Sequence, residues 1–241
     1  MRASEASEAS GFIHSVTSQT ETVEVTEELN LKRRLRGMKC GTITGARLHQ
    51  QEATQGGRRV HAAFVTLTYA QTGTWSPRHI SSYLDALKKH LKRRGIRLRY
   101  VWTLELQKRG APHYHVLVWL PLKSKIPKPD LCGWWPHGLS NIQRARNAVA
   151  YIAKYASKGG TYEFQIPRGA RIHATGGLDS AGAIERRWWL SPRWVRSAFP
   201  TICDLFRPEG GGFINRQTGE FCASPWMVCR INGAICLIKM E

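Results

Sequence analysis

The hydrophobic and polar positions of the chain become periodic near Val60 and predict a strand followed by a helix. The run HAAFVTLTY, residues 61–69, is apolar and rich in β-branched and aromatic side chains, which is typical of a strand. In the next segment Ser76 suits the N-cap of a helix, Pro77 its first position and Gly95 its end. Apolar side chains recur between them at helical spacing, at Ile80, Tyr83, Leu84, Leu87 and Leu91.

Two further β-rich runs, residues 97–107 and 113–121, flank the turn sequence KRGAP and predict a hairpin. A polar, proline-rich loop is expected up to about residue 141. Residues 142–158 predict a helix that ends at Gly159–Gly160. The pattern then weakens and predicts a short capped helix and short strands with glycine turns, in residues 191–199 and 211–241.

The beginning of the chain differs in composition from the rest. Residues 1–30 are rich in Ser, Thr, Glu and Ala and predict a disordered acidic tail. The basic cluster LKRRLRGMK that follows is either an arm that contacts DNA or a solvated linker. We therefore divide the chain into a tail with its basic linker (1–36), a core (58–160) and a C-terminal accessory region (161–241).

Charge narrows the class of partner. The chain carries 36 Lys and Arg against 17 Asp and Glu, a net charge of +19. Residues 1–30 hold six of the acids and one base, so residues 31–241 carry 35 bases, 11 acids and a net charge of +24. A folded domain of this charge favours a polyanion, and nucleic acid is the usual one because each neutralised phosphate releases counterions.

The six cysteines lack the two-residue gap of a zinc knuckle, and we interpret them as ordinary small core residues. The sequence shows no signal peptide and no run of about 20 apolar residues that could span a membrane. We expect a cytoplasmic protein with reduced thiols and no membrane partner.

The sequence GAPHYHVLVWLP, residues 110–121, contains the first candidate site. Alternate residues of a strand share a face, so His113 and His115 are expected side by side. A turn near Arg109 would place Glu105 on the same face, opposite one of the two. Two imidazoles and a carboxylate suit a divalent ion that must still bind a substrate. Alternatively, the histidines only donate hydrogen bonds and Glu105 pairs with Lys108 or Arg109.

The helix sequence AYIAKYASK contains the second candidate site. Tyr151 and Tyr155 lie four residues apart and share a helical face, and each is followed three residues later by a lysine, Lys154 or Lys158. Phenols with a cation one turn away are candidate nucleophiles, because the cation favours the phenolate and can bind a phosphate. The same pattern also fits an amphipathic helix with half-buried tyrosines and solvated lysines.

Three motifs in this order, FVTLTY (64–69), GAPHYHVLVWLP (110–121) and YIAKYASK (151–158), make the chain resemble the HUH endonuclease superfamily. The resemblance is greatest to the rolling-circle replication initiators (Rep proteins) of filamentous and icosahedral single-stranded DNA phages. It covers about residues 60–160, and the doubled tyrosine–lysine pattern resembles the members with two tyrosines.

The resemblance implies an α+β fold with a central antiparallel sheet flanked by helices, related to RNA-recognition and ferredoxin-like modules. The H-x-H strand would lie mid-sheet beside the strand of the first motif. His113, His115 and Glu105 would hold Mg²⁺ or Mn²⁺. Tyr151 or Tyr155, assisted by Lys154 and Lys158, would cut single-stranded origin DNA, leaving a 5′-phosphotyrosine and a free 3′-OH.

The resemblance also implies partners in a bacterial host cell. A host DNA polymerase would extend the 3′-OH. The sequence has no G-x-x-x-x-G-K-[ST] loop, so no nucleotide cofactor is expected and a host helicase would separate the strands. Further DNA contacts are predicted from a basic helix, whose alternative is a solvated face, and from two tryptophans that could stack bases. These residues are Lys88, Lys89, Lys92, Arg93, Arg94, Trp134 and Trp135.

Two other functions stay open at the level of sequence. A conjugative relaxase or an HUH transposase would use the same chemistry for another purpose. A non-catalytic RRM-like module would bind nucleic acid through its sheet and use the tyrosines for stacking; in that case removal of His113 and His115 would leave every activity intact. A metalloenzyme unrelated to nucleic acid would leave the charge of +24 unexplained.

Overall fold

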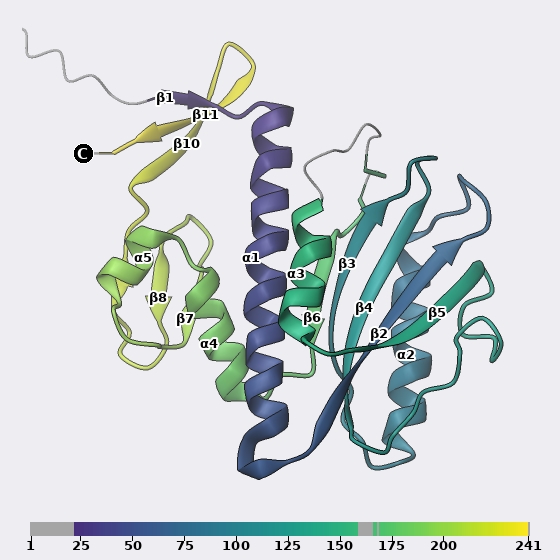
Figure 1. The fold of residues 1–241 in the computed structure, drawn as a ribbon. Helices are drawn as coiled ribbons and strands as arrows, with labels where there is room; N and C mark the ends of the chain where they lie inside the picture. Colours follow the sequence, from purple (N-terminus) through teal and green to yellow (C-terminus); the bar gives the residue numbers. More distant parts are fainter. Residues whose placement is uncertain (1–21, 159–165, 168, 241) are drawn as a thin grey trace, which may run out of the picture. The chain divides into compact units, whose positions relative to one another are not determined.

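The computed structural model describes residues 22–158, 166–167 and 169–240, which separate into two compact units (Figure 1). One unit comprises residues 27–223, and the described residues at the two chain ends form the other. The predicted core, residues 58–160, is thus part of a larger compact unit. The long helix before it and one strand after it, both described below, pack with the core elements.

The small unit is a three-stranded antiparallel sheet in the order β1-β11-β10. It consists of β1 (Thr22–Glu24), β10 (Trp226–Ile231) and β11 (Ala234–Lys239). Asn232 and Gly233 join the last two strands with positive φ angles of 49° and 83°, as a tight two-residue hairpin turn requires. The predicted short strands of the C-terminal region are confirmed. The expectation of disorder throughout residues 1–30 is wrong for β1, which pairs with β11; residues 1–21 lie outside the described part.

A five-stranded antiparallel sheet in the order β5-β2-β4-β3-β6 organises the larger unit and confirms the predicted α+β class. The strand with the two histidines, β4, lies in the middle beside β2, as predicted. Gly110, with a φ of 80°, forms the turn of the predicted hairpin. The strands are β2 (Val60–Tyr69), β3 (Arg99–Leu106), β4 (Pro112–Pro121), β5 (Gly138–Ala145) and β6 (His173–Gly176).

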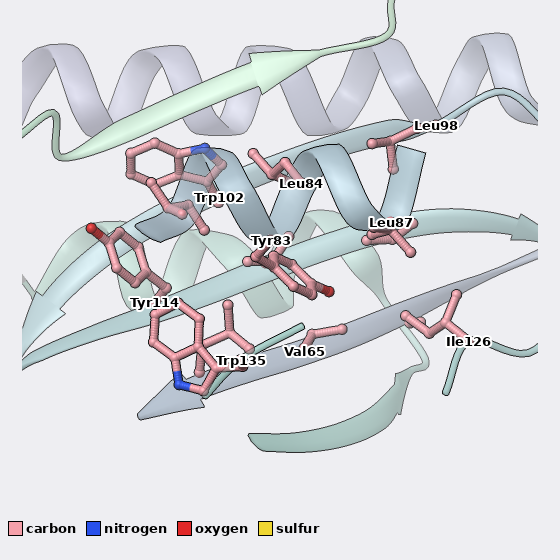
Figure 2. Packing of buried hydrophobic residues seen from close by; sticks show 14 of the residues in the cluster. Val65, Tyr83, Leu84, Leu87, Leu98, Trp102, Tyr114, Ile126 and Trp135 are labelled. Atoms are coloured by element: carbon pink, nitrogen blue, oxygen red, sulfur yellow. The ribbon is translucent and has the colours of Figure 1, made fainter. Parts of the chain in front are cut away.

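Helix α2 (Pro77–Lys92) covers one face of this sheet, and its apolar side chains form the larger hydrophobic core. The Ser76 hydroxyl caps the helix by accepting a hydrogen bond from the Arg78 N–H, and Gly95 follows the helix with a φ of 68°, as predicted. Figure 2 shows Tyr83, Leu84 and Leu87 of α2 packed over the strand residues Val65, Trp102 and Tyr114. Deletion of such a buried side chain typically costs about 2–5 kcal/mol.

Helices α1 (Glu27–Thr54) and α3 (Ala148–Lys158) cover the other face (Figure 1). Their small core contains Ala46 of α1, Phe64 of β2 and Ile152 of α3. Gly41 and Gly45 let α1 approach β6 closely, because a Cβ atom on Gly41 would lie 2.7 Å from Cε1 of His173. The face that carries the histidines and tyrosines is therefore enclosed by two helices.

The sequence interpretation missed helix α1. Residues 27–36 are its first turns and not a disordered tail or linker. Glu27 and Glu28 lie in the first turn, where acidic side chains favour a helix, and Glu28 pairs with Lys32 at 2.6 Å. The basic cluster is the exposed side of this helix, whose other side carries the buried Met38.

The sequence interpretation also missed strand β5. Residues 138–145 were expected as loop and helix, but they pair with β2 along their whole length. Only one side of β5 pairs with another strand, so the strand is polar and lacks the apolar run of a central strand. The helix therefore begins at Ala148 and not at Ile142; the predicted stop at Gly159–Gly160 lies outside the described residues.

The rest of the larger unit forms a small cluster around Trp188, Val195 and Phe199. The predicted short helix is confirmed as α5, but Pro192 occupies its N-cap position and gives no side-chain cap. No helix in the described ranges is long and apolar enough to cross a membrane. The remaining elements are η1 (Gln55–Gly57), α4 (Ser180–Leu190), α5 (Arg193–Ala198), β7 (Leu205–Phe206), β8 (Phe213–Asn215) and β9 (Phe221–Cys222).

Candidate active site

The candidate site begins with the register of three central strands. On β4, His113 lies opposite Thr68 of β2 and Glu105 of β3. His115 lies opposite Thr66 of β2. Directly opposed residues share a face, so the period of two that predicted a common face for Glu105 and both histidines is confirmed.

The two imidazoles stand side by side and each contacts polar neighbours. Their ring centroids are 4.7 Å apart and nearly parallel. Nε2 of His115 lies 2.8 Å from Oε2 of Glu105, and its Nδ1 lies 3.5 Å from Oγ1 of Thr66. Nε2 of His113 lies 3.3 Å from Oγ1 of Thr68, and its Nδ1 lies 3.2 Å from Nε2 of Gln107. These contacts fix both rings in orientation.

The hairpin turn positions Gln107. Arg109 donates a hydrogen bond to the side-chain oxygen of Gln107 at 3.0 Å. The same guanidinium donates to the carbonyl oxygens of Tyr69 and Ala70 at the end of β2. The turn is thereby tied to β2, and the amide that contacts His113 is held in place.

Helix α3 brings both predicted tyrosines onto this face. The Tyr155 ring lies 3.8 Å from the His115 ring between centroids, and the Tyr151 ring lies 5.9 Å from that of Tyr155. Both phenols pack on Phe64, with centroid distances of 4.5 Å for Tyr151 and 5.1 Å for Tyr155. The Tyr151 hydroxyl donates to Oε1 of Gln143 on β5 at 2.9 Å.

The two phenols differ in their electrostatic surroundings. Burial raises the pKa of Tyr155, and the neighbouring Tyr151 and Glu105 raise it further. Tyr155 is therefore held protonated until a cation or another favourable charge arrives. Lys154 is exposed on α3, while the side chain of Lys158 lies outside the described part, so its predicted role has no structural counterpart here.

The predicted DNA contacts on α2 lie on the other side of the sheet. Lys88, Lys89, Lys92, Arg93 and Arg94 are all exposed, but α2 covers the face opposite to the histidines. Arg94 also has a structural contact, because its guanidinium donates to the carbonyl oxygen of Lys125 at 2.8 Å. Binding of DNA by this helix stays a prediction.

The prediction that Trp135 stacks on bases is wrong. Its side chain has no exposed surface, and its indole N–H donates to the carbonyl oxygen of Thr68 at 3.1 Å. Figure 2 shows it packed near Tyr114 and Val65. Paired tryptophans gave no means of choosing the core member from sequence. Trp134 is only partly buried against the same core, and its predicted role is untested.

Sequence reasoning missed several residues of the site. Thr66 and Thr68 are polar and alternate with apolar residues in FVTLTY, which placed them on one face with Phe64. That alternation was a usable signal for Thr66 and Thr68. Gln107 and Gln143 gave no such signal, because their roles depend on the hairpin turn and on the missed strand β5.

The donor types suit a divalent metal ion. Two imidazoles and one carboxylate face the same way, and one imidazole–carboxylate pair is 2.8 Å apart. Within the described residues no group of three His, Cys, Asp or Glu side chains is gathered around a common point that could hold an ion. The chemistry of the donors therefore fits, while Glu105 pairs with His115 and His113 contacts Thr68 and Gln107.

Comparison with known proteins agrees with this geometry. Residues 62–160 match the model of a family described as replication-associated protein of the ORF2 and gene II protein type. The matched segment holds β2, β4 and α3, and thus every residue of the site described above. No curated protein matches the chain. The match indicates a role in replication of the kind that a Rep-type initiator performs.

Proposed function

We propose that the protein is a replication initiator that nicks and rejoins single-stranded origin DNA by tyrosine transesterification. The observation that carries this proposal is the position of the two tyrosines. Tyr155 packs on His115 at 3.8 Å and Tyr151 lies beside it, within a segment similar to replication-associated proteins. Nucleophile and candidate metal donors thus share one face of the sheet.

The chain's own residues account for the reaction in outline. A tyrosine oxygen forms a bond to the phosphorus of the scissile phosphodiester, and the bond from phosphorus to the 3′-oxygen breaks. The phenolic proton is balanced by the proton that the 3′-oxygen gains. His113, His115 and Glu105 would hold Mg²⁺ or Mn²⁺. Such an ion, when bound, supplies positive charge that stabilises the negative charge developing on the phosphate.

Two phenols on one face would allow two successive transfers. The covalent phosphotyrosine conserves the energy of the phosphodiester, so the free 3′-OH can reverse the step without a nucleotide cofactor. A second tyrosine can cut the regenerated junction while the first is still linked to DNA. Gln143 orients the Tyr151 hydroxyl, and Phe64 supports both rings.

The proposed setting is rolling-circle replication of a single-stranded DNA phage type in the bacterial cytoplasm. A host DNA polymerase would extend the 3′-OH, and a host helicase would separate the strands. Both partners follow from the proposed products, a single nicked strand with an extendable end. The net charge of +24 on residues 31–241 supports DNA as the substrate.

The test is cleavage of a single-stranded oligonucleotide that carries the origin of the replicon encoding the chain. With Mn²⁺ the wild type is expected to give a DNA adduct that survives denaturant, and with EDTA none. The variant His113→Ala/His115→Ala is expected to lose at least 100-fold in rate, whereas His90→Ala on α2 retains activity. Equal activity of the double variant and wild type would refute the proposal and favour a binding module.

A further inference from the structure

Two adjoining cavities border strand β5, the edge of the sheet. The first, of about 540 Å³, lies between strands β2 and β5 and the loop of residues 122–128. The second, of about 630 Å³, lies between the start of β2, the end of β5 and the first residue of α3. They share His61 and Arg144 in their walls. We refer to the two together as the β5 groove.

The β5 groove is strongly cationic. Its walls include five basic side chains, and none of its lining residues is Asp or Glu. Lys128 pairs with Asp130 at 3.3 Å. The other four form no ion pair with any described residue, so their charge is available to an anion. These four are Lys123, Lys125, Arg144 and Arg146.

The groove also has an apolar floor. Leu120, Leu122 and Ile142 line the first cavity beside the lysines. An unpaired nucleotide combines a flat apolar base with an anionic phosphate, so a concave site with both kinds of surface suits single-stranded DNA. A duplex keeps its bases stacked inside and presents only phosphates on a convex surface. The combination of surfaces therefore favours the single strand.

The lysine side of the groove is supported by the backbone. The N–H of Leu122 donates to the carbonyl oxygen of Arg59 at 3.1 Å, and that of Ser124 to the carbonyl oxygen of Pro121 at 2.8 Å. Arg94 binds the carbonyl oxygen of Lys125 from α2. The loop is thereby held beside β5, which lowers the ordering cost of binding.

The groove is connected to the candidate nucleophile. Gln143 lines the first cavity, and its side-chain oxygen accepts the hydrogen bond from the Tyr151 hydroxyl at 2.9 Å. Ala148, which lines the second cavity, is the first residue of the helix that carries Tyr151. A strand in the groove would thus lead directly to the tyrosine.

We propose that the β5 groove binds the single-stranded DNA that adjoins the cleaved phosphodiester. This inference rests on the proposed function, because it assigns a path to the substrate of the same site. Lys123, Lys125, Arg144 and Arg146 contact successive phosphates, and the apolar floor contacts a base. The basic face of α2 is not needed for this path.

The experiment compares double variants that each remove two positive charges from exposed positions. The groove variants are Lys123→Ala/Lys125→Ala and Arg144→Ala/Arg146→Ala, and the matched control is Arg33→Ala/Arg36→Ala on α1. Affinity for a single-stranded 20-mer and for its blunt duplex is measured by fluorescence anisotropy over a range of salt. We expect each groove variant to bind the single strand about tenfold more weakly. Its salt slope falls by about 1.4, since each lost phosphate contact contributes about 0.7.

Three outcomes decide the assignment. Groove variants that bind the single strand as tightly as the control overturn it. Groove variants that weaken duplex binding at least as much as single-strand binding overturn the single-stranded occupant. Adduct formation by wild type is measured in the same preparation at saturating DNA. A wild type that forms no adduct, yet needs the groove to bind the single strand, refutes the nicking function and supports the groove.

Discussion

Glu105 lies opposite His113 in the register of β3 and β4, yet its carboxylate contacts His115 at 2.8 Å. The side chain therefore reaches diagonally across the ladder to the next residue of the same face. His113 in turn contacts Thr68 and Gln107. This arrangement places one carboxylate within reach of both imidazoles and defines the face over which the tyrosines pack.

Glu105 is expected to contribute to metal affinity. Glu105→Gln keeps the shape of the side chain but removes the charge that favours a divalent ion. We expect Mn²⁺ to bind this variant at least tenfold more weakly, measured as the Mn²⁺-dependent rise in melting temperature. Glu185→Gln, which removes the ion pair with Arg47, is the control. Unchanged Mn²⁺ affinity in Glu105→Gln would exclude this carboxylate as a ligand.

Thr68 is expected to position His113 without touching substrate. Thr68→Val removes the hydroxyl 3.3 Å from Nε2 of His113 and retains a β-branched side chain suited to a strand. The concentration of Mn²⁺ that gives half-maximal cleavage should rise about 10- to 100-fold. The urea midpoint checks that the fold is intact. Thr74→Val in an exposed loop should change neither quantity, and an equal change in both variants would contradict the positioning role.

The sequence predicted the elements whose signals are local. The strand of residues 61–69, the helix capped by Ser76 and the hairpin around Gly110 each have a period, a cap or a turn residue within the element itself. The same period of two placed Glu105 and the two histidines on one face. Candidate chemistry could be read there because it depends only on alternation along paired strands.

The missed elements are stabilised by partners distant in sequence. Helix α1 is basic on its exposed side, and its packing depends on Gly41 and Gly45 approaching β6. Strand β5 is a polar edge strand whose pairing with β2 cannot be inferred from its own composition. Trp135 was misassigned because burial of one tryptophan in a pair is decided by tertiary packing, here against Tyr114.

Trp135 is expected to matter for stability and not for DNA contact. Trp135→Ala removes a fully buried side chain and its hydrogen bond to Thr68, and should lower the free energy of unfolding by about 3–5 kcal/mol. Trp134→Ala should cost less, because this side chain is only partly buried. Urea denaturation measures both. The milder Trp135→Phe should bind DNA like wild type, and selective loss of DNA binding in this folded variant would argue for a contact.

Acid is expected to destabilise the fold through two buried histidines. Burial, with a contribution from Arg99, lowers the pKa of His49 to about 3, and burial near Arg186 lowers the pKa of His173 to about 4. Below their ordinary pKa of about 6.5 these groups take up protons in the unfolded chain but not in the folded one. The free energy of unfolding therefore falls as pH falls from about 6.5, by up to about 1.4 kcal/mol per pH unit for each histidine.

Urea titrations between pH 7 and pH 5 measure this dependence. His49→Gln removes one of the two groups and should flatten the decline between pH 6.5 and pH 5. His90→Gln, at a half-buried position on α2, is the control. A decline that is equally steep in wild type and His49→Gln would show that His49 is not the group responsible.

The most direct test of the proposed nicking function is to locate the covalent bond. The adduct of wild type with single-stranded origin DNA is trimmed with nuclease, digested with trypsin and mapped by mass spectrometry. Cleavage after Arg146, Lys154 and Lys158 separates the tyrosines into NAVAYIAK and YASK, so each peptide reports on one of them. The proposed function predicts a nucleotide phosphate on Tyr151, Tyr155 or both, and none on Tyr151→Phe/Tyr155→Phe. A modified residue elsewhere, or origin DNA that binds with Mn²⁺ present but never becomes linked, would contradict it.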